Sequence, residues 1–82
     1  MTARPLKRSL TLRGHRTSVS LEEAFWQEFR AIASEKGISI NELAAVIDAD
    51  RGVESGLASA IRVYILSQIK ARQRPVSDAP SN

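Results

Sequence analysis

The stretch Arg-Thr-Ser-Val-Ser-Leu at residues 16–21 decides the fold of this chain of 82 residues. Successive side chains of an extended strand point to opposite faces, so the two aliphatic residues share one face with Thr17. The other face is entirely polar and carries Arg16, Ser18 and Ser20. We expect one short N-terminal strand, about residues 15–21, with one face to bury and one face that forms hydrogen bonds.

This strand needs a partner for its backbone hydrogen bonds. The most economical partner is the same strand of a second subunit, which gives an intersubunit two-stranded antiparallel ribbon. Residues 9–13 also alternate, but Leu10 and Leu12 lie at even positions while the aliphatic residues of the strand lie at odd ones. Gly14 is expected to break the register as a turn or bulge. The sequence leaves open whether Leu10 and Leu12 extend the ribbon or pack back as an arm.

Charge is distributed unevenly along the chain. Residues 1–21 carry five basic side chains and no acid, residues 22–54 carry eight acids against three bases, and residues 55–82 carry four bases against one acid. A basic segment before a polar-faced strand suits contact with nucleic acid, because Lys and Arg neutralise phosphates. We expect residues 1–13 to form a basic, partly mobile arm and residues 73–82 a disordered tail.

Composition excludes several classes of function. The chain has no cysteine, which argues against disulfides and thiolate metal sites, and it has no apolar run long enough to span a bilayer. His15 is the only histidine and has no acid beside it, and Asp48 and Asp50 have no further oxygen ligands nearby. We expect a cytoplasmic protein that is not an enzyme and needs no cofactor or metal.

Three helices are expected after the strand, at about residues 22–36, 39–51 and 54–72. In the first, Leu21, Phe25, Phe29 and Ile32 form one apolar stripe with Trp26 at its edge, under the ribbon or at a subunit contact. Ser20 and Glu23 match a capping box, which competes with a role for Ser20 on the polar face. Gly37 is expected to end this helix.

The second helix has the clearest start in the sequence. Ser39 and Glu42 form a capping box, and Ile38 can contact Leu43 across it. The helix is expected to stop at Gly52. The third helix is apolar around most of its circumference, so we expect it to be buried from more than one side, as at the centre of a dimer.

These features together resemble the ribbon-helix-helix (MetJ/Arc) superfamily of bacterial DNA-binding proteins. The strand RTSVSL, the helix EEAFWQEFRAIASEKG and the turn with Gly37, Ser39 and Asn41 match its pattern over residues 14–50. The third helix is a departure, since the family usually ends after the second, and it indicates a subgroup of short bacterial proteins. The resemblance implies a homodimeric domain over residues 14–72 whose ribbon enters the major groove of DNA.

The resemblance also implies roles for individual residues. Base reading falls to Arg16, Ser18 and Ser20, with most of the discrimination expected from Arg16 because hydroxyls bond to several base edges. Phosphate contacts are expected from the basic arm, the strand entry and the start of the second helix. They are Arg8, Arg13, His15, Ser39, Ile40 and Asn41. The dimer core is expected to contain Val19, Leu21, Phe25, Trp26, Phe29, Ile61, Tyr64 and Ile65.

The sequence therefore predicts sequence-specific binding of duplex DNA by a homodimer that regulates transcription. The alternative is a protein-interaction or assembly module, antitoxin-like or a scaffold, that uses the same fold for dimerisation. The operator, the regulated genes, any effector or protein partner and assembly beyond the dimer stay open.

Overall fold

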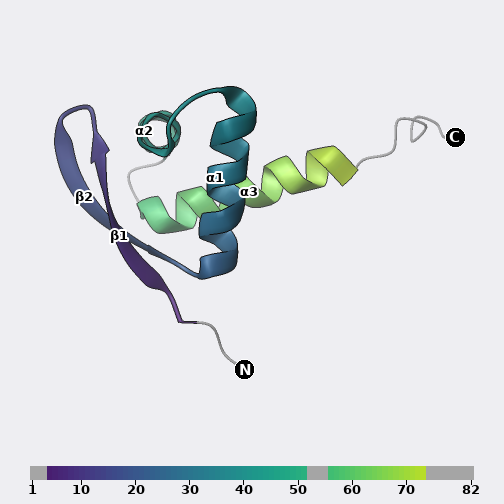
Figure 1. The fold of residues 1–82 in the computed structure, drawn as a ribbon, viewed down its shortest axis with the longest axis horizontal. Coiled ribbons are helices and arrows are strands. Elements are labelled where there is room, and N and C mark those ends of the chain that lie inside the picture. Colours follow the sequence, from purple (N-terminus) through teal and green to yellow (C-terminus); the bar gives the residue numbers. More distant parts are fainter. Residues whose placement is uncertain (1–3, 52–55, 74–82) are drawn as a thin grey trace, which may run out of the picture.

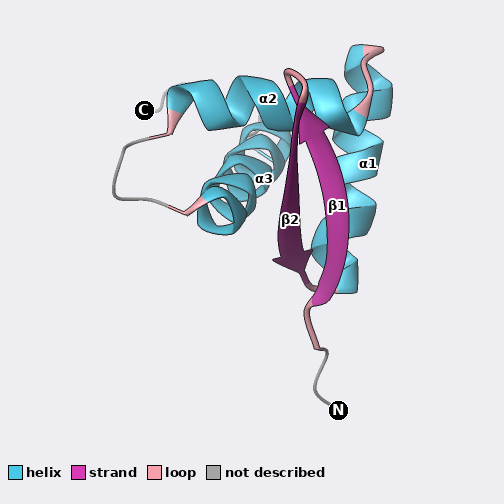
Figure 2. Ribbon diagram, turned by 90° about the vertical axis from the view of Figure 1, so that its left-hand side faces the viewer, coloured by secondary structure: helices cyan, strands magenta, loops and turns pink. Residues whose placement is uncertain are grey.

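The computed structural model describes residues 4–51 and 56–73, which form an antiparallel pair of strands followed by three helices (Figure 1). The elements are β1 (Leu6–Leu12), β2 (His15–Leu21), α1 (Glu23–Lys36), α2 (Ile40–Asp50) and α3 (Leu57–Gln73). The three helices lie on one face of the strand pair (Figure 2). The expected mainly helical fold with three helices after the ribbon is confirmed, but the chain supplies two strands where one short strand was expected.

Both strands of the ribbon come from one chain, which corrects two expectations. The residues expected to form a partly mobile arm include β1, and β1 is the antiparallel partner of β2 that the sequence predicted from a second subunit. The loop between the strands has two residues, Arg13 and Gly14, with φ of +52° and +87°. Positive φ at both positions is the geometry of a type I′ turn, whose twist matches that of the strands it joins.

The hairpin register explains why the buried residues lie at even positions in β1 and at odd positions in β2. Leu10 pairs with Thr17 and Leu12 pairs with His15, so each even position of β1 lies opposite an odd position of β2. Directly opposite residues share a face, and the even leucines of β1 therefore join the odd aliphatic residues of β2 on one buried face. The buried side chains of this face are Leu10, Leu12, Val19 and Leu21.

Helix α1 buries a slightly different stripe from the expected one. Trp26 is fully buried while Phe25 is only partly buried, because the hairpin covers the Trp26 side of the helix. The N-cap is Glu22, with no hydrogen bond from a side chain to the cap, so the Ser20–Glu23 capping box does not form. Gly37 ends the helix in the left-handed conformation at φ +72°.

Helix α2 begins as the sequence indicates. The Ser39 hydroxyl accepts a 3.0 Å hydrogen bond from the Glu42 amide, and a Glu42 carboxylate oxygen accepts one of 3.0 Å from the Ser39 amide. Leu43, Ala44 and Ile47 face the core. The helix ends at Asp50, and the expected stop at Gly52 and start of the third helix at residue 54 lie outside the described residues.

Helix α3 is less buried in a single chain than its composition led us to expect. Only Ile61 and Ile65 are fully buried, whereas Val63 and Leu66 are exposed. Most residues expected in a dimer core fill the core of one chain instead, and Phe25 and Tyr64 are partly buried at its edge. The fully buried members of that set are Val19, Leu21, Trp26, Phe29, Ile61 and Ile65.

Candidate nucleic-acid interface

The outer face of the hairpin is a continuous polar surface contributed by both strands. Its three cross-strand pairs are Lys7 with Ser20, Ser9 with Ser18, and Thr11 with Arg16. All six side chains are exposed except that of Ser20, which is half-buried. We call this set the ribbon face, and it brings together the three expected base-reading residues of β2 with three residues of β1.

The ribbon face combines two cationic side chains with four hydroxyls. Neither strand contains an acidic residue, so no carboxylate within the ribbon opposes an approaching phosphate. A two-stranded ribbon fits a DNA major groove, which is about 12 Å wide. The face therefore offers two cations and four hydroxyls that could form hydrogen bonds in such a groove.

Helix α1 holds the hairpin in place through Trp26. The indole Nε1–H donates a 2.9 Å hydrogen bond to the backbone carbonyl of Leu6 at the start of β1. The guanidinium of Arg8 lies 5.6 Å from the centre of the Trp26 ring and 4.0 Å from a carboxylate oxygen of Glu23. Arg8 pairs with Val19 on the opposite face from the base-reading residues, so the structure does not bring this expected phosphate contact together with them.

The same end of the ribbon is also fixed where β2 enters α1, because Leu21 at the end of β2 pairs with Leu6. Arg62 of α3 donates two hydrogen bonds to one carboxylate oxygen of Glu22, 3.1 Å from Nε and 2.9 Å from an Nη. The same guanidinium lies 5.6 Å from the centre of the Phe25 ring. The pKa of Glu22 is lowered chiefly by a hydrogen bond to its own backbone and next by the hydrogen bond from Arg62. This carboxylate is thus held as an anion and links α3 to the strand–helix junction.

The first turn of α2 lies beside the free edge of β1. The Asn41 side-chain oxygen accepts a 3.1 Å hydrogen bond from the backbone amide of Thr11. Within the described residues no acceptor is bound to the amides of Ile40 and Asn41, whereas the Glu42 amide is used by the Ser39 cap. Two free amides at a helix N-terminus therefore stand next to the ribbon, as anion binding requires.

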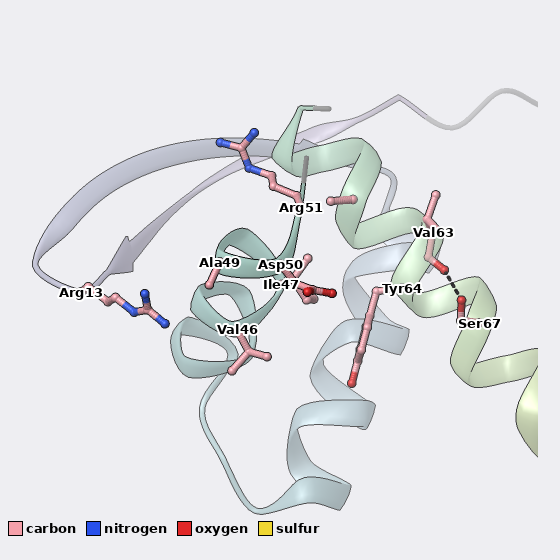
Figure 3. Close-up of a pocket in the computed structure, with 10 residues that line it drawn as sticks. Arg13, Val46, Ile47, Ala49, Asp50, Arg51, Val63, Tyr64 and Ser67 are labelled. Carbon is pink, nitrogen blue, oxygen red and sulfur yellow. Dashed lines mark hydrogen bonds between the residues drawn. The ribbon is translucent and has the colours of Figure 1, made fainter. Parts of the chain in front are cut away.

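The remaining expected phosphate contacts lie at the tip of the hairpin. His15 is exposed at the start of β2. Arg13, in the turn, extends toward α2 instead of over the ribbon face (Figure 3). The structure therefore places neither residue on the ribbon face: His15 pairs with Leu12 on the opposite face, and Arg13 lies near a different surface.

Sequence reasoning missed half of the ribbon face. Lys7, Ser9 and Thr11 were placed in the arm and given no role in base reading. Their alternation with Leu10 and Leu12 is a strand pattern, and Arg13-Gly14 between two alternating stretches is a signal for a two-residue hairpin. Reading both signals together would have placed these three residues beside Ser20, Ser18 and Arg16.

Comparison with known families agrees with this architecture. The family model described as "Ribbon-helix-helix domain" matches residues 5–69, and so includes β1 and most of α3. The chain belongs to the ribbon-helix-helix family. Ribbon-helix-helix proteins are generally DNA-binding regulators that act as dimers, and their domains are typically non-enzymatic.

One solved structure resembles this ribbon-helix-helix chain over nearly its whole length. It is an uncharacterized protein from Bordetella pertussis Tohama I, with 30% sequence identity and a TM-score of 0.64. The similarity covers 94% of this chain and 66% of that protein. No curated protein matches the chain.

The described residues were also searched for a metal-binding group and for a membrane-spanning helix. They contain no group of three or more His, Cys, Asp or Glu side chains that could hold a metal ion. No helix among them is long and apolar enough to cross a membrane.

Proposed function

We propose that this protein binds duplex DNA sequence-specifically through the ribbon face and acts as a transcriptional regulator without catalytic activity. The observation that carries the proposal is the acid-free polar surface that the register builds from both strands. A polar face on one strand alone would have many explanations. Six polar side chains in three opposed pairs, backed by a face whose buried side chains are all apolar, favour a ribbon that presents donors outward.

Each part of the ribbon face has a distinct role in this proposal. Arg16 reads guanine, because its guanidinium can donate to the O6 and N7 atoms together. Ser18 and Ser20 of β2, with Ser9 and Thr11 of β1, bond to base edges with less discrimination. Lys7, at the other end of the face from Arg16, contacts bases or the phosphates that flank them.

Phosphate binding is assigned to the border of the ribbon. The free amides of Ile40 and Asn41 and the positive end of the α2 dipole favour an anion there. Ser39 contributes by fixing this first turn through its capping box, and His15 adds a donor near the hairpin tip. These contacts position the ribbon and carry little sequence information.

Binding sites selected from a random duplex library, and DNA flanking the coding region, test the proposal. Wild type should prefer the selected site over a scrambled duplex. Arg16→Ala should lose about 1–3 kcal/mol of affinity for the selected site and much less for the scrambled one. Ser39→Ala should weaken both together, because it disturbs an anchor and not a reader.

Arg30→Ala is the matched control, since Arg30 is an exposed arginine on α1 with an ion pair to Glu23 and no place on the ribbon face. It should leave the preference unchanged. Weak binding by wild type with no preference among duplexes would reject the proposal and favour the protein-interaction alternative. An equal loss of discrimination in the Arg16 and Arg30 variants would reject the reading role of Arg16.

A further inference from the structure

Thr11 carries the only methyl group on the ribbon face. It is exposed, although it lies between the buried residues Leu10 and Leu12. The other five side chains of the face end in a cationic group or a primary hydroxyl. They are Lys7, Ser9, Arg16, Ser18 and Ser20. The face therefore has one apolar contact point, and the position of that point decides which group on the DNA it meets.

The methyl lies beside Arg16, the side chain that we assign to guanine. Thr11 and Arg16 are directly opposite one another in the hairpin register. The backbone amide of Thr11 points away from β2, because it donates a 3.1 Å hydrogen bond to the Asn41 side-chain oxygen. An outward amide marks a non-hydrogen-bonded pair, in which the Cα atoms are about 4.5 Å apart and the side chains lie closer than in the alternate pairs. The Thr11 methyl and the Arg16 guanidinium therefore leave the ribbon side by side.

The same hydrogen bond fixes Thr11 relative to the start of α2. Asn41 lies in the first turn of that helix, where we assign the free backbone amides to a phosphate. Thr11 is thus held both across the ribbon from Arg16 and beside the group that anchors the DNA backbone. Contacts to the backbone set the register of a protein on the duplex, so the methyl should meet the same base position in every complex.

The major groove offers a methyl group at one kind of unmodified base only. Thymine carries it at C5, whereas guanine presents the O6 and N7 acceptors that a guanidinium binds together. Neighbouring base pairs are about 3.4 Å apart along the duplex, a step that two opposed side chains with Cβ atoms about 4.5–5.5 Å apart can span. A methyl beside an arginine therefore matches a methylated pyrimidine in the base pair next to a guanine.

We propose that Thr11 contacts the 5-methyl group of a pyrimidine in the base pair next to the guanine that Arg16 binds. Thymine supplies this group in unmodified DNA, and 5-methylcytosine carries the same group. The contact rests on the proposed function, since it requires the ribbon face to lie in the major groove. It gives β1 a part in sequence recognition that the hydroxyls of the face do not provide.

Sites selected from a random duplex library give the first test. The guanine is located as the base pair at which Arg16→Ala abolishes the preference. Thymine should occupy a neighbouring base pair in the sites that wild type selects, and it should lose this prevalence in the sites that Thr11→Ser selects. Wild-type sites without thymine on either side of the guanine would overturn the proposal.

Replacing that thymine by deoxyuridine removes one methyl group and leaves the hydrogen-bonding edge of the base unchanged. Wild type should bind the deoxyuridine duplex about threefold to fivefold more weakly, the effect of one lost methyl contact. Thr11→Ser lacks the matching methyl of the protein and should bind both duplexes equally. Thr11→Val keeps a methyl and loses the hydroxyl, so it should keep the wild-type ratio of affinities.

Thr17→Ser is the matched control, because it removes the same methyl from the opposite face of the hairpin, where Thr17 is half-buried opposite Leu10. It should keep the wild-type ratio. The same ratio in Thr11→Ser would overturn the role of Thr11 and leave the proposed function intact. Weak binding of every duplex by wild type, without preference, would reject the proposed function and the methyl contact with it.

Cytosine and 5-methylcytosine at the same position distinguish the two sources of the methyl group. A gain in affinity on methylation that Thr11→Ser lacks supports recognition of the methyl group on either pyrimidine. A Thr11-dependent effect confined to the thymine and deoxyuridine pair supports thymine as the natural contact.

Discussion

Trp26 joins helix α1 to the first residue of the hairpin, because its Nε1–H donates a 2.9 Å hydrogen bond to the carbonyl oxygen of Leu6. The indole has no exposed surface and makes an edge-on contact with Phe29, with ring centres 6.1 Å apart. One side chain thus sets the position of β1, and with it half of the ribbon face, relative to the helical core.

We expect Trp26→Phe to lower the free energy of unfolding by about 1–3 kcal/mol, since it removes this hydrogen bond and part of a packed side chain. Amide hydrogen exchange at the Leu6 end of β1 should also speed up. Urea unfolding followed by circular dichroism measures the first effect. Phe25→Leu is the control, because Phe25 is only partly buried, and an equal loss in both variants would contradict the role assigned to the indole.

The hairpin turn should depend on Gly14. Its φ of +87° is unfavourable for a residue with a Cβ, although no atom within 4 Å would clash with one. Gly14→Ala should therefore destabilise the fold by about 1–2 kcal/mol through backbone strain alone. Gly56→Ala is the control with equally open space and no positive φ, and it should destabilise the fold less than Gly14→Ala, through a weaker cap at the start of α3 only. Thermal unfolding of the two variants distinguishes strain from contact.

The hairpin also shows why the sequence predicted only half of the ribbon. The alternation in β2 identified its polar and buried faces without any partner. The sequence indicates a turn or bulge at Gly14 and leaves open whether Leu10 and Leu12 extend the ribbon or pack back as an arm, so it does not identify their strand as the partner of β2. A two-residue turn reverses the chain and pairs even positions with odd ones, so the apparent mismatch was the register itself.

Helix ends at Gly37 and Ser39 could be predicted because local hydrogen bonds decide them. The relative burial of side chains on α1 could not. Ser39 and Gly37 act through backbone hydrogen bonds within a few residues, which sequence spacing specifies. Phe25 and Trp26 are neighbours on α1, and their relative burial depends on where the hairpin lies. That position is a long-range property set by contacts such as the one between Trp26 and Leu6.

The capping box at α2 gives a direct stability prediction. Ser39→Ala removes the acceptor for the Glu42 amide and should cost about 1 kcal/mol of unfolding free energy. Ser34→Ala, at an exposed position within α1, should change stability little, because alanine is a good helix former. Chemical denaturation of both variants checks the difference, and similar values would mean that the cap contributes nothing measurable.

Acid should weaken the link between α3 and the strand–helix junction. The pKa of Glu22 is lowered from its ordinary value of 4.5 by hydrogen bonding to its backbone and to Arg62. Its contribution is therefore fully present above pH 4.5 and is lost as pH falls through the lower, folded-state pKa. Glu22→Gln should lose stability near neutral pH and show a shallower decline on acidification. Glu28→Gln, which removes a carboxylate with no ion pair among the described residues, should keep the wild-type slope.

Substitutions of the two adjacent basic residues of β1 should affect different properties, one the binding of DNA and the other the stability of the fold. Lys7 lies on the ribbon face opposite Ser20, whereas Arg8 lies on the other face over the Trp26 ring. If Lys7 contacts a phosphate, Lys7→Ala should flatten the slope of log affinity against log salt by about 0.9 and leave the melting temperature unchanged. Arg8→Ala should do the reverse, lowering stability modestly through the lost stacking on Trp26 while keeping the salt slope. Fluorescence anisotropy with labelled duplex at several salt concentrations, together with thermal melts, measures both effects. Equal salt slopes for the two variants would show that the register does not decide which basic side chains reach the DNA.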